Sequence, residues 1–198
     1  MIRKGHGVYA LVRPGSERKL PSGAHPVIGN ALDEATFAGS IPPAATLVHL
    51  VGTPHPSPAK ATEFQRVDRA SIGAAVAAAG TAGVRHFVYV SVAHPAPIMK
   101  AYIAVRQEGE TLVTASGIPA TIVRPWYVLG PGHRWPYLLV PAYAILRRLP
   151  ATRDTAERLG LVTREAMVAA LVRAVETPPA GGTHIVGVPD IQRARASH

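Results

Sequence analysis

Apolar and polar residues along the chain predict alternating strands and helices. Six runs rich in valine, isoleucine and other apolar residues have the length of strands: Val8–Val12, His25–Ile28, Thr46–Val51, His86–Val92, Thr121–Arg124 and Thr183–Val188. Helical patterns cover four other stretches: Leu32–Ala38, Glu63–Ala79, Lys100–Ser116 and Arg164–Glu176. Several strands lack clean alternation, which is typical of parallel strands buried on both faces. The pattern predicts an α/β fold with a doubly wound parallel sheet.

Residues at the ends of these elements agree with the proposed boundaries. Asp33 and Thr163 each precede a predicted helix and have side chains that cap helix N-termini. Glycines follow the predicted helices at points where a left-handed residue ends the spiral: Gly80, Gly83 and Gly117.

No internal repeat or linker divides the chain. We therefore expect a single domain over residues 1–189, with a small substrate-side segment around residues 126–163. The polar residues 190–198 are expected to form a loose tail.

Composition and charge narrow the classes of function. The chain has 198 residues, no cysteine, and 21 basic against 12 acidic residues, which gives a formal net charge of +9. Without cysteine, disulfides, zinc–thiolate sites, iron–sulfur clusters and thiol catalysis are excluded. The basic residues are scattered rather than concentrated on one element, so an anionic small ligand explains them better than a nucleic acid does.

The sequence shows no signal peptide and no membrane-spanning segment. Its longest apolar stretch, Trp135–Leu146, is interrupted by two prolines, and a span needs about 20 apolar residues. We therefore expect a cytoplasmic protein. Because an arginine pair follows this stretch, peripheral contact with a membrane is a less favoured alternative.

The carboxyl ends of the predicted strands carry the candidate binding residues, since ligands of open α/β sheets bind in the loops that follow. Arg13 follows the first strand with no acidic residue beside it, which favours the 2′-phosphate of NADP over the free ribose of NAD. Asn30 follows the second strand, and Gly52 and Thr53 follow the third. Each has a structural alternative: Arg13 could solvate a strand end, and the proline-rich loop after Thr53 would form without a ligand.

Ser91, Tyr102 and Arg106 are the candidate catalytic residues. Ser91 ends the fourth strand, and Tyr102 and Arg106 lie four residues apart on a predicted helix, hence on one face. A fixed cation lowers the pKa of a neighbouring phenol and suits it to acid–base catalysis. Ser91 would then hold a substrate oxygen. The alternative is a surface stack of tyrosine on arginine with an unrelated serine.

The loop Arg124–Gly130 follows the fifth predicted strand and is a candidate ligand-binding loop. The loop and the residues after it contain an arginine, aromatic residues and glycines, so it can cover a ligand and set specificity. The histidines near strand ends and loops show no metal-ligand spacing with a carboxylate, and no metal site is assigned: His49, His55, His94 and His133.

Taken together, six segments resemble the short-chain dehydrogenase/reductase superfamily. They are "YALVRPGS", "VIGNALD", "TLVHLVGTP", "GVRHFVYVSV", "AYIAVRQEGE" and "GIPATIVRPWYVLGPG", in order and with family-like spacing over residues 6–180. The similarity is greatest to its atypical and extended branches, the NAD-dependent epimerase/dehydratase and NmrA-like proteins. The resemblance implies a Rossmann-like fold and NADP or NAD as the cofactor.

The resemblance also implies roles for single residues. Ser91, Tyr102 and Arg106 correspond to the serine, tyrosine and lysine of the family. The loop after Arg124 would approach the nicotinamide and the substrate. The cofactor would contact residues at the strand ends and on the helix: Arg13, Asn30, Ala31, Val51, Gly52, Thr53, Arg106, Pro125 and Val128.

This sequence departs from the family pattern in three ways. Arg106 replaces a lysine, and Asn30 replaces an aspartate. The family's first strand and its Gly-x-x-Gly-x-x-Gly loop have no counterpart in "MIRKGHG", where Gly5 or Gly7 would end the helix that follows that loop. That strand would be central, so the strands Val8–Val12 and Thr46–Val51 are expected to pair directly or to leave unpaired edges. Either a start assigned at an internal methionine or a degenerate relative would explain the difference.

Two functions remain open from the sequence. The first is hydride transfer to or from a carbonyl or alcohol of a small molecule, or epimerisation through a transient ketone, impaired by the missing loop. Tyr102 would act as the acid or base, Ser91 as the oxyanion holder and Arg106 as the electrostatic helper. The alternative is a non-catalytic module that senses a nucleotide or assembles a complex.

Overall fold

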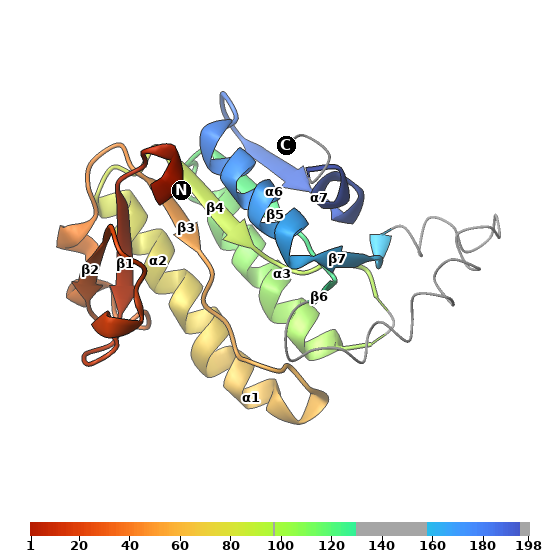
Figure 1. Ribbon diagram of the computed structural model, residues 1–198. Coiled ribbons are helices and arrows are strands. Elements are labelled where there is room, and N and C mark those ends of the chain that lie inside the picture. The colour runs from red at the N-terminus through yellow and green to blue at the C-terminus, as the bar shows by residue number, and fades with distance from the viewer. Residues whose placement is uncertain (97, 130–157, 195–198) are drawn as a thin grey trace.

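The computed structural model describes residues 1–96, 98–129 and 158–194 (Figure 1). The described strands form three parallel arrangements. The first is a two-stranded sheet of β1 (Val8–Val12) and β2 (Ala24–Ile28). The second is a four-stranded sheet in the order β3-β4-β5-β8, made of Thr46–His49, His86–Val90, Ala120–Val123 and Thr183–Val186. The third pairs β6 (Tyr127–Leu129) with β7 (Leu161–Thr163).

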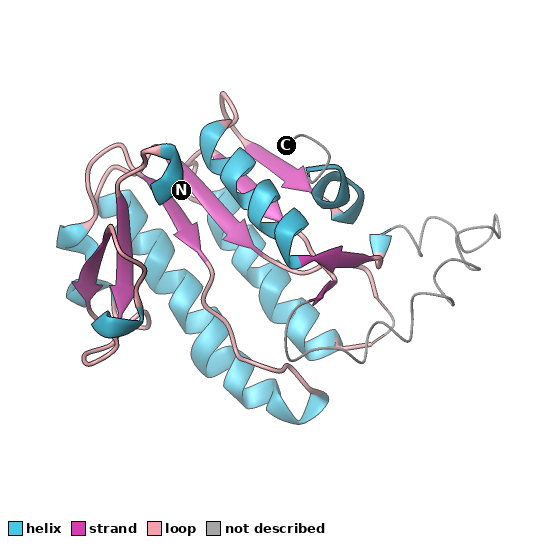
Figure 2. Cartoon of the chain, in the orientation of Figure 1, coloured by secondary structure: helices cyan, strands magenta, loops and turns pink. Residues whose placement is uncertain are grey.

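Helices cover both faces of the four-stranded sheet (Figure 2). One face packs against a continuous helical stretch made of α1 (Ala61–Glu63), a π-helical turn η6 (Phe64–Arg69) and α2 (Ala70–Thr81), and against α3 (Lys100–Ala115). The opposite face packs against α6 (Arg164–Glu176) and α7 (Val188–Ala194).

Within the described residues, the chain also forms short 3-10 turns. They are η1 (Ile2–Lys4), η2 (Glu17–Lys19), η3 (Glu34–Thr36), η4 (Ala38–Ser40) and η5 (Pro58–Lys60). Gly5 ends η1 in the left-handed conformation, with φ of 81°, as the sequence suggested for Gly5 or Gly7.

The side chains of the central strands alternate between two buried cores. Along β4, Phe87 and Tyr89 face the core under α2 and α3, whereas Val88 faces the core under α6. Ile122 and Val123 of β5 divide in the same way. This alternation follows from the two-residue repeat of a strand, and it requires apolar residues at successive positions. The predicted Rossmann-like parallel α/β fold is therefore confirmed.

The elements predicted from the sequence agree closely with the structure in most places. All six predicted strands are present, with ends shifted by one or two residues. The three long helices are present, and Thr163 caps α6 by accepting a hydrogen bond from the Ala166 amide. Asp33 also acts as a cap, accepting from the Ala35 amide.

Three predictions of local structure are wrong. Instead of a helix over Leu32–Ala38 there are only η3 and η4, because Thr36 Oγ donates 2.7 Å to the Asp33 carbonyl and competes with helical bonding. Of the three glycines expected to end helices, Gly80 lies inside α2, and Gly83 and Gly117 have the left-handed conformation. The tail expected from residue 190 is helical through Ala194, because fully buried Ile191 packs against the core under α6.

The two larger sheets are not joined to each other. In the described part of the chain, no ladder or other backbone hydrogen bond connects β1 with β3. Of the two outcomes expected for the strands Val8–Val12 and Thr46–Val51, the structure shows unpaired edges rather than direct pairing. The strands of both sheets nevertheless point the same way (Figure 1).

No helix in the described ranges is long and apolar enough to cross a membrane. The apolar stretch Trp135–Leu146, Gly130 and most of the expected substrate-side segment lie outside the described residues.

Candidate functional site

The carboxyl ends of β3, β4 and β5 bring three loops to one edge of the sheet. Because the three strands are parallel neighbours, the residues that follow them meet there. Val51, Gly52 and Thr53 follow β3, Ser91 follows β4, and Arg124 follows β5. The helix α3 starts on the same side and brings Tyr102 and Arg106 to this edge (Figure 1).

Tyr102 is the half-buried phenol of the site. Its ring centroid lies 5.1 Å from the ring centroid of Phe64 and 5.1 Å from the guanidinium carbon of Arg106. The expected contact of Tyr102 with Arg106 is therefore present. The ring therefore contacts both an aromatic ring and a cation, and these contacts orient the phenol.

Arg106 points into the protein interior and is 5% exposed. Its Nη1 donates hydrogen bonds of 3.1 Å to the Val90 carbonyl and 3.4 Å to the Val51 carbonyl, while Nη2 pairs at 2.7 Å with Asp68. The Arg106 side chain therefore connects the carboxyl ends of β3 and β4 through the backbone carbonyls of Val51 and Val90.

The same guanidinium explains why residue 52 is glycine. A Cβ at Gly52 would lie 2.0 Å from Arg106 Nη2 and 3.1 Å from Asp68 Oδ1, so any larger residue would displace the ion pair. The next residue is held by the other oxygen of that carboxylate. Thr53 donates to Asp68 Oδ2 from its amide at 3.0 Å and from its hydroxyl at 2.6 Å.

Electrostatics keep Arg106 charged despite its burial. Burial opposes the charge, but the neighbouring Tyr102, Tyr89 and Asp68 outweigh it, and the pKa of Arg106 is raised. Beside it, burial raises the pKa of Tyr89 to about 12, although Arg106 opposes that increase.

His49 is a buried histidine next to this cluster. Its side chain is 3% exposed, and its ring centroid lies 5.6 Å from that of Tyr89. Burial, and then the charge of Arg106, lowers the pKa of His49 to about 3. The imidazole is therefore neutral throughout the physiological range.

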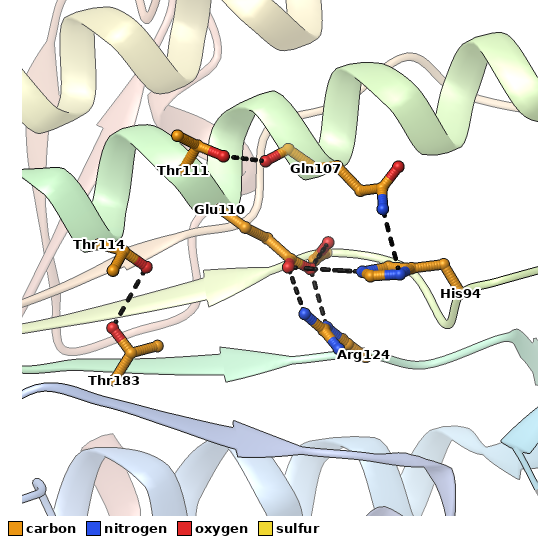
Figure 3. Close-up of polar contacts among 8 residues, drawn as sticks. His94, Gln107, Glu110, Thr111, Thr114, Arg124 and Thr183 are labelled. Atoms are coloured by element: carbon orange, nitrogen blue, oxygen red, sulfur yellow. Dashed lines mark hydrogen bonds and ion pairs between the residues drawn. The ribbon is translucent and has the colours of Figure 1, made fainter.

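A second polar cluster surrounds Glu110 (Figure 3). Ser91 Oγ donates a 2.6 Å hydrogen bond to Glu110 Oε1, and Arg124 donates to both carboxylate oxygens. His94 lies 3.4 Å from the carboxylate and is contacted on its other ring nitrogen by Gln107. Both oxygens of Glu110 accept from Arg124, and the single proton of Ser91 is directed to Oε1.

The Ser91 hydroxyl can therefore accept, but not donate, a further hydrogen bond. Its side chain is also 4% exposed. The sequence prediction that Ser91 holds a substrate oxygen stays a prediction.

The Glu110 cluster borders a groove of about 600 Å³ between α3 and strands β5 and β8. Gln107 and Thr111 line it from the helix, and Thr183 and Ile185 line it from the edge strand. Thr114 Oγ lies 3.3 Å from Thr183 Oγ across it (Figure 3).

The remaining predicted cofactor residues fall into two groups. Arg13 and Asn30 are exposed at the ends of β1 and β2 and Ala31 is half-buried, whereas Pro125 is buried and its carbonyl accepts from the Ala93 amide. Val128 lies in β6 and is 38% exposed. Whether these residues contact a cofactor stays a prediction, as do the roles of Ser91, Tyr102 and Arg106.

Exposed polar and charged side chains stand at the carboxyl ends of β1 and β2. The guanidinium of Arg13 has no hydrogen bond or ion pair within the described ranges, and such a group suits a phosphate. The Asn30 side chain accepts from the Leu32 amide and so fixes the turn after β2. Across residues 1–96, 98–129 and 158–194, no three acidic or histidine side chains gather as a metal site.

Asp68 and Glu110 are the two residues of the site that the sequence did not single out. Glu110 carries a signal that could have been used, because it lies four residues after Arg106 and eight after Tyr102 on one helix face. Asp68 carries none, since its contacts depend on how the preceding helix packs against α3.

Comparisons with known proteins agree with this fold. The sequence model of a family described as NAD(P)H-binding matches residues 1–178. A short-chain dehydrogenase/reductase superfamily protein from Agrobacterium tumefaciens, solved with bound NAD, is 19% identical, with a TM-score of 0.67 over 94% of this chain and 71% of that one. No curated protein matches the chain.

Other solved structures share the fold at similar identity. A nucleoside-diphosphate-sugar epimerase from Staphylococcus aureus is 18% identical over 90% of this chain, with a TM-score of 0.60. The Bordetella bronchiseptica enzyme WbmG in complex with NAD is 18% identical over 94%, with a TM-score of 0.64. This chain spans 60% of the length of the epimerase and 66% of WbmG.

Proposed function

Because the chain belongs to the NAD(P)H-binding family, we propose that it binds a nicotinamide dinucleotide at the strand-end edge and acts on a small molecule there. The proposed reaction is hydride transfer to or from a carbonyl or alcohol, or epimerisation of a carbon through a transient ketone. The sequence resemblance to short-chain dehydrogenases/reductases agrees with the NAD(P)H-binding family model and with the fold of the solved structures.

The observation that carries this proposal is the environment of Tyr102. The phenol lies half-buried beside the strand ends, with its ring against Phe64 on one side and 5.1 Å from the Arg106 guanidinium carbon on the other. A phenol fixed beside a buried cation is suited to hold or release a proton at its hydroxyl. The bound dinucleotide would supply the hydride chemistry.

Other residues of this edge would bind and orient the ligands. The turn Val51–Thr53 and Asn30 would contact the adenosine, and Arg13 would contact a ribose 2′-phosphate, which favours NADP over NAD. Ser91 would accept a hydrogen bond from a substrate hydroxyl, because its own proton is donated to Glu110. Scattered basic charge supports a small-molecule partner and no nucleic acid.

The first test measures dinucleotide binding. We expect the purified chain to enhance NADPH or NADH fluorescence with saturation below millimolar concentration. No saturation with either dinucleotide would contradict the proposal.

The second test separates catalysis from binding. Tyr102→Phe is expected to keep the dinucleotide affinity and to lower the turnover of an alcohol substrate by about 10²–10⁴-fold, the usual contribution of an acid–base group. Tyr9→Phe, which removes a phenol hydroxyl from the exposed face of β1, is the matched control and should leave turnover unchanged. Equal turnover of the two variants would contradict the role of Tyr102.

A non-catalytic, nucleotide-sensing module is the second candidate function. It is favoured by two contacts, since Asp68 forms an ion pair with Arg106 and Glu110 accepts the hydrogen bond that Ser91 donates. For such a module, dinucleotide would bind, and Tyr102→Phe would leave every cellular activity of the protein unchanged.

A further inference from the structure

The helix that precedes β4 presents two residues to α3 at matching intervals. Phe64 and Asp68 are four apart on the π-helical turn η6, and Tyr102 and Arg106 are four apart on α3. The first residues of each pair contact each other through tilted rings, with centroids 5.1 Å apart, and the second residues form an ion pair at 2.7 Å. The turn η6 therefore contacts both predicted catalytic residues of α3. Single π-helical turns of this kind occur frequently at functional sites.

Asp68 also holds the loop that follows β3. Its Oδ2 accepts from both the amide and the hydroxyl of Thr53, while its Oδ1 contacts Arg106 beneath Gly52. The carboxylate is 1% exposed. Because the carboxylate is buried and both oxygens contact protein groups, a ligand does not reach it, so its effect on a ligand must pass through the loop.

We propose that Asp68 is the positioning residue of the dinucleotide site. Through Thr53 and Arg106 it fixes the turn Val51–Thr53 in the one conformation that leaves the backbone of Gly52 accessible to a nucleotide. This proposal rests on the proposed function, because it assumes that the dinucleotide binds at this turn.

The geometry explains why both Arg106 and Asp68 are needed to fix the turn Val51–Thr53. Arg106 alone would hold the carbonyl of Val51, and the Thr53 side chain would remain free to rotate. Asp68 adds two hydrogen bonds to residue 53 from the opposite side, so the turn is held at both of its ends. Holding a loop in its bound conformation before the ligand arrives reduces the entropy lost on binding.

Two variants of Thr53 give the sharpest test. Thr53→Ser keeps the hydroxyl that donates to Asp68, whereas Thr53→Val keeps the shape and removes the donor. We expect the serine variant to bind NADH and NADPH about as tightly as the wild type, and the valine variant to bind both at least about fivefold more weakly, since the turn is no longer held. Equal affinities of the two variants would overturn the proposal.

Asp68→Asn is the larger change and needs a control for stability. It should weaken both dinucleotides by more than about tenfold, because it also leaves Arg106 without its anion. Val113→Ala removes buried side-chain volume from the same α3 helix without touching the turn, so it should lower the melting temperature and leave the affinity unchanged. If dinucleotide affinity falls in proportion to the melting temperature in both Asp68→Asn and Val113→Ala, Asp68 acts only through stability and the proposal is wrong.

A readout without any cofactor completes the test. The amide of Thr53 should exchange with solvent slowly in the wild type and faster in Thr53→Val and Asp68→Asn, and Val113→Ala should leave it unchanged. A wild-type chain that binds neither dinucleotide would contradict the proposed function and this inference with it. Wild-type binding with an unaffected Thr53→Val variant would contradict this inference alone.

Discussion

The four-stranded sheet and the two-stranded sheet differ in how completely they are covered. In the first, Phe87, Val88 and Val123 are fully buried between helices on both faces. In the second, Tyr9 and Ile28 are more than half exposed, and short 3-10 turns take the place of long helices. The predicted catalytic residues therefore stand on the well-packed part of the molecule. The residues expected to contact adenosine and the 2′-phosphate stand on the sparsely packed part.

This contrast indicates that the two halves of the expected dinucleotide site depend on different forces. Around Arg106, buried ion pairs and hydrogen bonds fix each side chain. Around Arg13 and Asn30, positions are set by strand pairing and by a local turn. Four predictions follow this contrast, from the largest expected effect to the smallest.

Core truncation should separate the two sheets most clearly. Phe87→Ala is expected to lower the free energy of unfolding by about 3–5 kcal/mol, since it empties a fully buried site. Tyr9→Ala, at a side chain that is 55% exposed, should cost less than about 1 kcal/mol. Urea unfolding measures both, and similar losses would mean that the sheets are equally packed.

A methyl group added to glycine should lower stability in one region and leave it nearly unchanged in the other. Gly52→Ala is expected to cost about 1–3 kcal/mol of stability, because its Cβ would overlap the fixed guanidinium of Arg106. Gly39→Ala, in η4 with no atom within 4 Å of the added carbon, should change stability by less than about 0.5 kcal/mol. Thermal or urea denaturation would reveal the difference, and an unaffected Gly52→Ala would show that Arg106 can move aside.

Acid should destabilise the well-packed region through His49. Its pKa is about 3 in the folded protein and 6.5 in the unfolded chain, so the unfolded state binds the extra proton between these values. The contribution of His49 to the free energy of unfolding is fully present above pH 6.5 and is lost as the pH falls towards 3. At pH 5 the loss amounts to about 2 kcal/mol.

The variant His49→Phe removes the titrating group and keeps a ring against Tyr89. It should therefore flatten the pH dependence of stability between pH 6.5 and 4, measured by urea unfolding at each pH. The same slope in wild type and variant would show that other groups cause the acid sensitivity.

Arg13 tests the sparsely packed region by ligand choice. Arg13→Ala should lower the affinity for NADPH by about tenfold, the loss expected for a charge-assisted hydrogen bond, and leave the affinity for NADH unchanged. Arg18→Ala removes a nearby exposed arginine and serves as the control. If both dinucleotides weaken equally, Arg13 does not read the 2′-phosphate.

Sequence patterns predicted the well-packed region better than the other. The strands of the four-stranded sheet are recognisable because successive residues such as Phe87 and Val88 are apolar for opposite cores. The helix predicted over Leu32–Ala38 from its apolar spacing is absent, because the hydrogen bonds that Asp33 accepts from Ala35 and Thr36 favour separate turns. Ile191 was missed because a single apolar residue in a polar tail gives no period.

The site was predictable only where its residues share one element. Tyr102 and Arg106 could be paired because a helix places residues four apart side by side. The partners of Arg106 and Ser91 could not, because Asp68 and Glu110 reach them from other elements through tertiary packing. Whether a serine proton is available to a substrate depends on such partners, and a linear motif carries no information about them.

The pairing of β6 with β7 has a consequence for how this protein can diversify. These short strands hold residues 129 and 161 next to the main body, so the two ends of the intervening segment are anchored by backbone hydrogen bonds. The entropy cost of closing a chain between two fixed points grows slowly, by about 0.6 kcal/mol for each doubling of the number of residues. Because β6 and β7 already fix those points, a change in the number of residues between them alters the closure cost little. Leu159, which is buried in the core under α6, is the residue before β7 that such a change must keep.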